Sequence, residues 1–129
     1  MALNAGLKLM TKAGALTKRA QYREVYTRGM ARSNEFVMIK ALVNNLEVSR
    51  YGFSVNKPLG KAVVRNRIKR LLKEIVRVTS IQSGWDIVFI ARYGAVEADY
   101  YQLKQFVEKL LFRAELLMTK NEVASTEIN

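Results

Sequence analysis

The sequence predicts an α+β fold, a two-layer sandwich of helices against a small mixed sheet in the order αββαβα. Residues 62–77 and 99–118 repeat apolar residues at helical spacing, whereas 35–43, 49–57 and 85–92 are short runs rich in β-branched and aromatic residues. The chain has 129 residues, half of them hydrophobic, and one proline. This composition indicates one globular domain that can bury its own core.

The N-terminal third predicts an arm, a helix and a strand. We expect residues 1–14 to form a flexible arm, because glycines and lysines interrupt their apolar residues. Thr17 can cap a helix that ends at Gly29. The strand 35–43 has two apolar faces, so one should meet the core and the other something besides bulk water. The first face carries Val37, Ile39 and Val43, and the second carries Phe36, Met38 and Leu42.

The rest of the chain predicts strands and helices in alternation: strand 49–57, a helix from Ala62, strand 85–92 and helix 99–118. Pro58 and Gly60 break the chain between the first strand and the first helix. We expect the polar tail 119–129 to fray, which leaves 15–118 as the folded domain.

Positive charge is concentrated in residues 50–77, which hold nine Lys and Arg residues against one acid, Glu74. This segment carries +8 of the chain's net +11. On a helix most of these cations share one face and the apolar residues share the other. The basic face comprises Arg65, Asn66, Lys69, Arg70, Lys73 and Arg77. A solvated charged face is the alternative, but only one acid, Glu74, is available to relieve such a face, which favours a polyanionic ligand.

The chain has no Cys and no His, which excludes a thiolate nucleophile, an imidazole base and a Cys/His zinc site. No pair of acids has the spacing of a metal site, and Asp86 is explained as a strand-start or capping group. We therefore predict no catalytic residue and no metal ligand in the protein. No apolar run reaches 18 residues and no leader pattern opens the chain, so we expect a cytoplasmic protein without a membrane partner.

Two smaller features fit an RNA ligand. Lys57 and Lys61 bracket the start of the basic helix, where Gly60 lets the chain turn and the first amides are free to bind a phosphate. Tyr22 and Tyr26 are four residues apart on the first helix. They are either core residues or, beside arginines, a platform on which unpaired bases stack. The sequence leaves both interpretations open.

The run from Arg50 to Arg70 reads R-x-G-F-S-V-x-K-x-x-G-x-A-V-x-R-N-R-I-K-R, which resembles the signature of the bacterial ribonuclease P protein subunit. The surrounding order is similar too: an aromatic pair on a helix that ends at Gly29, then EFVMI, WDIVFIAR and a closing helix. The resemblance covers roughly residues 15–117.

The resemblance implies a sandwich with a left-handed β-α-β crossover, an exception to the usual handedness. It implies a non-catalytic protein subunit of an endoribonuclease, whose partner RNA and RNA-bound magnesium hydrolyse the 5′ leader from precursor tRNA. The implied partners are the catalytic RNA and the leader, and no obligate protein partner is expected. The implied RNA-binding residues are Arg65, Asn66, Arg67, Lys69, Arg70 and Lys73, and the charge pattern of the same helix adds Arg77. The implied leader cleft is formed by Tyr22, Tyr26, Val37, Ile39 and Phe53.

The chain departs from the family pattern at Pro58, at Lys61, which replaces a frequent Asn, and at Ile39. Lys57-Pro58 stands where many members have a lysine pair, although Lys61 restores a charge nearby. Ile39 replaces the tyrosine of some members. Arg67 lies near the apolar border of its helix, so it is either an RNA contact or a structural hydrogen-bonding residue.

Three alternatives have a similar charge. A ribosomal-type rRNA-binding protein has no reason to keep the spacing of the signature. A helix–turn–helix DNA binder is disfavoured by the strand directly before the basic helix. Amphipathic membrane attachment needs an apolar face that the predicted core already uses.

Overall fold

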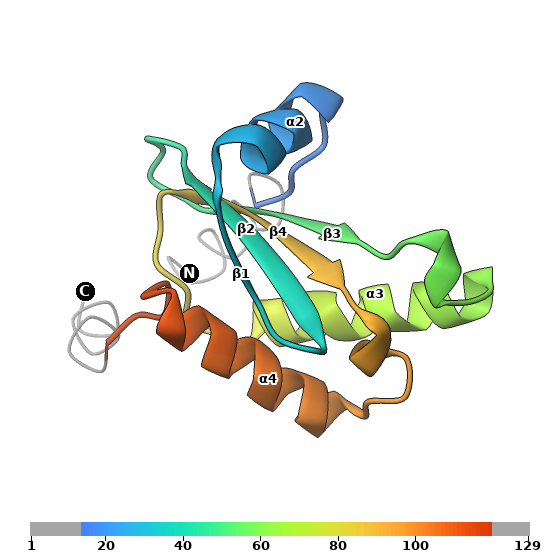
Figure 1. Cartoon of the computed structure of the whole chain (residues 1–129). Helices are drawn as coiled ribbons and strands as arrows, with labels where there is room; N and C mark the ends of the chain where they lie inside the picture. Colours follow the sequence, from blue (N-terminus) through green and yellow to red (C-terminus); the bar gives the residue numbers. More distant parts are fainter. Residues whose placement is uncertain (1–13, 120–129) are drawn as a thin grey trace, which may run out of the picture.

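The computed structural model describes residues 14–119 (Figure 1). The expected flexible arm and frayed tail therefore lie outside the described residues, except for Gly14 and Thr119. The described helices are α2 (Arg19–Arg28), α3 (Ala62–Arg77) and α4 (Tyr100–Arg113), with two 3₁₀ turns, η1 (Lys57–Leu59) and η2 (Tyr93–Ala95). The strands are β1 (Met30–Ser33), β2 (Val37–Val43), β3 (Arg50–Ser54) and β4 (Trp85–Ala91).

The four strands form one mixed sheet in the order β1-β2-β4-β3. β2 is antiparallel to β1 and to β4, whereas β3 is parallel to β4. The parallel pair is connected through α3, so the predicted β-α-β unit is present. The predicted α+β class with a small mixed sheet is confirmed.

One strand, β1, was not predicted. Three of its four residues are exposed, because it is an edge strand with one neighbour, and its sequence MARS has no alternating apolar pattern. Asn34 forms the turn into β2: its Oδ1 accepts hydrogen bonds from the backbone N–H groups of Phe36 (2.9 Å) and Val37 (3.0 Å). The turn is polar and local, and it places β1 without any apolar signal.

The main core lies between the sheet and the pair α3 and α4 (Figure 1). Its strand residues occupy adjacent register positions, with Ile39 opposite Phe89 and Phe89 beside Phe53. Phe53 stacks on Phe89 with ring centroids 5.6 Å apart. The Phe89 ring is fully buried, so this face of the sheet is the central layer of the core.

The helix α2 crosses the other face of the sheet, which Figure 1 shows above the strands. Three neighbouring register positions receive it: Lys40 in β2, Val88 in β4 and Gly52 in β3. Tyr26 lies beside Lys40, Val25 packs in the cluster of Val88, and Tyr22 lies over Gly52. The second apolar face of the strand predicted at 35–43 therefore meets a helix, as its composition indicated.

The helix ends agree with the sequence only in part. Gly29 follows α2 as predicted, but the N-cap residue is Lys18, and the Gln21 side chain in the first turn accepts hydrogen bonds through Oε1 from the N–H groups of Thr17 (2.9 Å) and Lys18 (3.0 Å). The prediction of Thr17 as the cap was therefore wrong. Asp99 caps α4 by accepting a hydrogen bond from the Gln102 N–H at 2.8 Å.

The C-terminal end of α4 was predicted too late. The helix ends at Arg113 instead of Met118, and Glu115 adopts a φ of 59°. The chain then turns back, because Leu116 is fully buried and its carbonyl accepts a hydrogen bond from the Gln82 N–H at 2.7 Å. The sequence pattern alone would allow the helix to continue, but the chain leaves the helix so that Leu116 can be buried.

Residues 14–16 pair with the outer edge of β3. The Tyr51 N–H donates to the Gly14 carbonyl at 2.7 Å, and the Leu16 N–H donates to the Tyr51 carbonyl at 2.9 Å. Leu16 is also buried against the α2 side of the sheet. Gly14, which we had assigned to the flexible arm, is therefore part of the folded domain, and it shields an edge strand.

Candidate nucleic-acid interface

The helix α3 has the amphipathic character that the sequence predicted. Its buried side consists of Ile68, Leu72, Ile75 and Val76, which join the main core. Asn66, Arg70 and Lys73 are exposed on the opposite side, and Lys69 is half-buried at its border. Packing of the apolar side fixes the orientation of the basic side.

Three cations on this helix are free to bind an external anion. Lys69, Arg70 and Lys73 form no ion pair with any residue of 14–119. They follow one another at intervals of one and three residues along one side of α3, so their charges repel each other unless a ligand intervenes. We name these three residues the free cations of α3.

Two of the other three arginines in the predicted set, Arg67 and Arg77, are engaged within the protein. The Arg67 guanidinium donates to the Val96 carbonyl at 3.3 Å and to the Ala98 carbonyl at 3.0 Å. It thereby ties α3 to the loop before α4, which favours the structural role. The Arg77 guanidinium forms two hydrogen bonds to the carboxylate of Glu74, at 2.6 and 3.0 Å, and this contact lowers the pKa of Glu74.

The start of α3 gathers positive charge at the positive end of the helix dipole. Lys61 is the N-cap residue and supplies no side-chain cap, and the first turn contains no acid. Arg65 folds back, so that its Nε donates to the Gly60 carbonyl at 3.1 Å. Gly60 has a φ of 147°, which confirms the sharp turn predicted there. Lys57 is exposed beside this turn. Whether a phosphate binds here stays a prediction.

A groove of about 510 Å³ lies along the edge strand β3, between α2 and α3. Aromatic rings form one part of its wall and cations another. We call it the β3 groove; it is lined by Gly14, Ala15, Leu16, Tyr22, Tyr51, Phe53, Lys69, Lys73, Val76 and Arg77. Two of the free cations of α3 therefore face the same space as three aromatic rings.

The predicted leader cleft is only partly assembled. Tyr22 and Phe53 both line the β3 groove, but Val37 and Ile39 are 0% and 1% exposed in the core, on the face of the sheet opposite to Tyr22. Placing these two residues in a cleft was wrong. Both faces of the strand are apolar, and we selected the face that α3 and α4 cover.

Tyr26 does not line the β3 groove but lies next to it, between Tyr22 and Lys40. Its ring is 38% exposed and lies 6.4 Å from the Tyr22 ring, and the Lys40 ammonium lies 5.6 Å from its centroid. Lys40 also donates to the Tyr26 carbonyl at 3.1 Å. The sequence gave no reason to select Lys40, because a lysine inside an apolar strand is normally a solvated residue.

The groove tyrosines are held by the sheet. Burial raises the pKa of Tyr22 above its ordinary value, and a hydrogen bond from the Phe53 backbone partly opposes that increase. Burial likewise raises the pKa of Tyr51, which lies 6.3 Å from the Phe89 ring. Both phenols are therefore neutral at physiological pH and present uncharged rings to the groove.

Asp86 has the structural role that the sequence favoured. Its carboxylate accepts two hydrogen bonds from Arg50, at 2.8 and 2.7 Å, and one from the Asn44 amide at 2.9 Å. The contact with Asp86 raises the pKa of Arg50. Within residues 14–119 no three acids lie close enough to hold a metal ion. In the same range, no helix is long and apolar enough to cross a bilayer.

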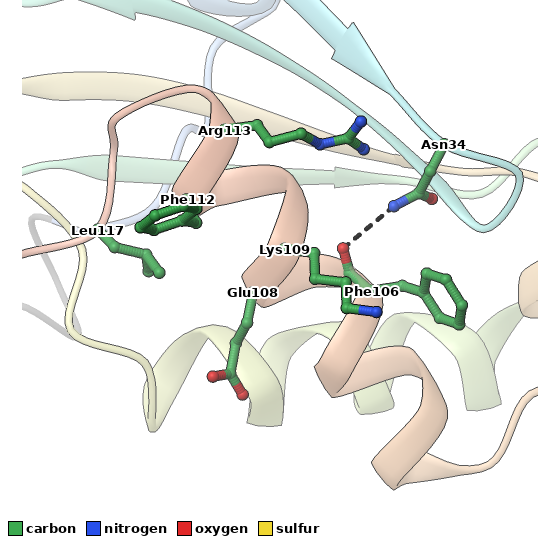
Figure 2. A pocket seen from close by; sticks show the side chains of 7 residues that line it. All are labelled: Asn34, Phe106, Glu108, Lys109, Phe112, Arg113 and Leu117. Atoms are coloured by element: carbon green, nitrogen blue, oxygen red, sulfur yellow. Dashed lines mark hydrogen bonds between the residues drawn. The ribbon is translucent and has the colours of Figure 1, made fainter.

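A second hollow, of about 550 Å³, lies against α4 and shares no lining residue with the β3 groove (Figure 2). Its walls are mainly apolar, and they include Phe106, Phe112 and Leu117. The Lys109 ammonium lies 5.4 Å from the Phe106 centroid, and the Asn34 amide donates to the Phe106 carbonyl at 3.1 Å. The hydrogen bond from Asn34 attaches α4 to the β1–β2 turn.

A mixed sheet with a basic helix beside an aromatic groove defines an RNA-binding α+β protein, and comparison with known proteins narrows this class. The family model described as Ribonuclease P matches residues 10–115. A ribonuclease P protein component of Dehalococcoides mccartyi (strain CBDB1) is 44% identical over 116 residues, which are 90% of this chain and 97% of that protein.

Solved structures agree with the sequence match. A Staphylococcus aureus RNase P protein mutant with defective mRNA degradation activity superposes with a TM-score of 0.77 at 33% identity, covering 84% of this chain and 94% of that one. The Thermotoga maritima RNase P protein gives a TM-score of 0.72 at 30% identity, covering 77% and 96%. The chain belongs to the ribonuclease P protein family. This assignment decides against the ribosomal-type and DNA-binding alternatives.

Proposed function

We propose that this chain is the protein subunit of ribonuclease P and that its β3 groove binds the single-stranded 5′ leader of precursor tRNA. The observation that carries the proposal is that Tyr22 and Phe53 share one groove with Lys69 and Lys73. Single-stranded RNA is bound by rings on which bases stack and by cations that follow the backbone. The groove offers both, and duplex RNA does not present its bases in this way.

The exposed side of α3 is proposed to bind the catalytic RNA. Asn66 and Arg70 lie on this side and are absent from the groove wall. An exposed arginine and an exposed amide suit contacts to phosphate and sugar. Such contacts position the protein on the RNA but do not depend on the base sequence of the RNA. One helix would then contact two RNAs, the leader through its groove border and the catalytic RNA through its outer side.

Hydrolysis is assigned to the RNA subunit and to magnesium bound by that RNA. This assignment is supported by the side chains present: the chain has no His and no Cys, and Asp86, a buried acid, is engaged by Arg50 and Asn44. The protein contributes cations near crowded phosphates. We expect it to lower the magnesium and salt that cleavage requires, and we place it with its RNA in the cytoplasm.

The test compares cleavage of precursor tRNA by a bacterial-type catalytic RNA with and without this protein. We expect cleavage at lower magnesium when the protein is present, and none by the protein alone. RNA-free cleavage that survives repurification would contradict the assignment of catalysis to the RNA.

The groove itself is tested with Tyr22→Ala, measuring affinity for precursor and mature tRNA in the assembled holoenzyme. Loss of one stacking ring is worth ~1–3 kcal/mol per base, and only the precursor has a leader. The ratio of the two affinities should therefore fall several-fold. The matched control is Tyr101→Ala, because Tyr101 is 79% exposed on α4 and lines neither the groove nor the hollow. Equal loss for both tRNAs would return Tyr22 to the role of a core residue.

A further inference from the structure

Gly52 allows the Tyr22 ring to lie directly on the backbone of β3. A Cβ atom built on Gly52 would be 2.6 Å from both Cε1 and the hydroxyl oxygen of Tyr22, and 2.7 Å from Cζ. Ordinary van der Waals contact begins at 3.4 Å, so the ring would have to move by about 0.8 Å or more. A glycine inside a strand often marks the close approach of another group, and here that group is the groove tyrosine.

The position of the ring is defined at its far end as well. The Tyr22 hydroxyl also interacts with the backbone of Phe53, the residue after Gly52, and this interaction lowers the pKa of Tyr22 against the larger, opposite effect of burial. The side chain of Phe53 points to the opposite face of the sheet and is held by stacking on Phe89. Two of the three aromatic residues of the groove, Tyr22 and Phe53, are thus positioned by consecutive residues of β3: Gly52 leaves space for the Tyr22 ring, and Phe53 follows it in the strand.

We propose that Gly52 is a positioning residue for leader binding, because it lets the Tyr22 ring reach the place where a base of the leader stacks. This inference rests on the proposed function of the β3 groove. It goes further because it assigns a role to the glycine of the G-F-S-V motif. The backbone conformation does not require a glycine at this position, since Gly52 is not among the residues with positive φ. The glycine is needed for space above the strand.

The alternative is that Gly52 serves packing alone. In that case a larger residue would lower the stability of the protein and weaken every RNA ligand to the same extent. A positioning role predicts a selective loss, since displacing the ring affects only the RNA that contacts it. The two roles therefore differ in the ratio of the affinities for precursor and mature tRNA.

The experiment compares Gly52→Ala with Ser54→Ala in the reconstituted holoenzyme. Ser54 lies two residues further along β3, on the same face, and lines no wall of the groove. Affinity for precursor and mature tRNA is measured together with the melting temperature of the protein. We expect Gly52→Ala to lower the precursor-to-mature ratio several-fold, in the direction of Tyr22→Ala, and Ser54→Ala to leave it unchanged.

A double variant isolates the contact. In a Tyr22→Ala background the ring is gone, so adding Gly52→Ala should cause no further fall in the ratio, and the melting temperature should recover relative to Gly52→Ala alone. If Gly52→Ala is too unstable for the binding assay, the melting temperature of the double variant is the test. If that temperature does not recover, the new Cβ does not clash with the Tyr22 ring, and the inference is overturned.

The outcomes also separate the inference from the proposed function. If Tyr22→Ala leaves the ratio unchanged, the groove does not bind the leader and the proposed function fails. If Tyr22→Ala lowers the ratio but Gly52→Ala does not, or weakens both tRNAs equally, only the positioning role of Gly52 is overturned.

Discussion

Removing the three free cations of α3 should change the salt dependence of RNA binding by a predictable amount. The variant is Lys69→Ala/Arg70→Ala/Lys73→Ala. None of the three side chains forms an ion pair within residues 14–119, so each is free to neutralise one phosphate. Their replacement breaks no contact in the core, because the buried side of α3 is formed by other residues.

The magnitude follows from counterion release. Each phosphate contact contributes ~0.7–0.9 to the slope of log K against log salt. The triple variant should therefore lower the slope by roughly two to three if all three cations contact RNA. When salt is raised from 50 to 200 mM, each phosphate contact contributes about a threefold loss of affinity. Each contact that the variant lacks therefore makes the loss over this range about threefold smaller. The measurement is a set of binding isotherms at several salt concentrations, with the catalytic RNA and with precursor tRNA.

The matched control removes the same charge from another helix. Lys104→Ala/Lys109→Ala/Arg113→Ala takes three cations from α4, where Lys104 is paired with Glu108 and Lys109 lies beside Phe106. We expect a much smaller change in slope from this control. Equal slopes in the two triple variants would refute the reasoning, because only net charge would then matter. An unchanged slope in the α3 variant would make its basic side a solvated surface.

Three further predictions concern residues that the structure places inside the protein. Arg67→Ala should lower the melting temperature with little change in the salt slope, because Arg67 binds two loop carbonyls; a full unit of lost slope would show a phosphate contact instead. Ile39→Ala should cost ~2–5 kcal/mol of unfolding free energy in urea titrations and leave the precursor-to-mature ratio unchanged; a selective fall in that ratio would restore Ile39 to the cleft. Arg50→Ala should cost about 3 kcal/mol in the same titration, because it leaves the Asp86 carboxylate buried beside Asn44 alone; a loss near zero would show that water replaces the guanidinium.

Periodicity predicted the elements whose residues pack on one side only. The basic helix was placed correctly because its apolar and charged residues separate cleanly, and burial of Ile68, Leu72 and Ile75 confirms that separation. The position of Arg67 at the border of the two sides was also visible in the sequence. Its hydrogen bonds to the loop before α4 follow from that position.

The sequence could not select between two apolar faces of one strand. In β2 the residues Val37 and Ile39 alternate with Met38 and Lys40, and each set contacts a helix. Periodicity shows that the two sets face opposite ways, but only tertiary packing shows which set faces α2. The edge strand β1 was missed for a related reason, since its exposed residues carry no pattern at all.

The β3 groove could not be predicted from the sequence either. Its walls come from the segment 14–16, α2, β3 and α3, which are brought together only by the fold. Local signals did mark several of its parts, including Tyr22, Phe53 and Lys69. What they lacked was the geometry of Gly52, whose missing side chain lets α2 approach β3 closely enough for a tyrosine of one to form the groove wall of the other. A motif glycine without a positive φ is uninformative in the sequence, because the atom that requires it belongs to a residue 30 positions earlier in the chain. The glycine of the G-F-S-V motif and Tyr22 of the first helix are therefore in direct contact, and replacing Gly52 should change leader binding through the position of the Tyr22 ring.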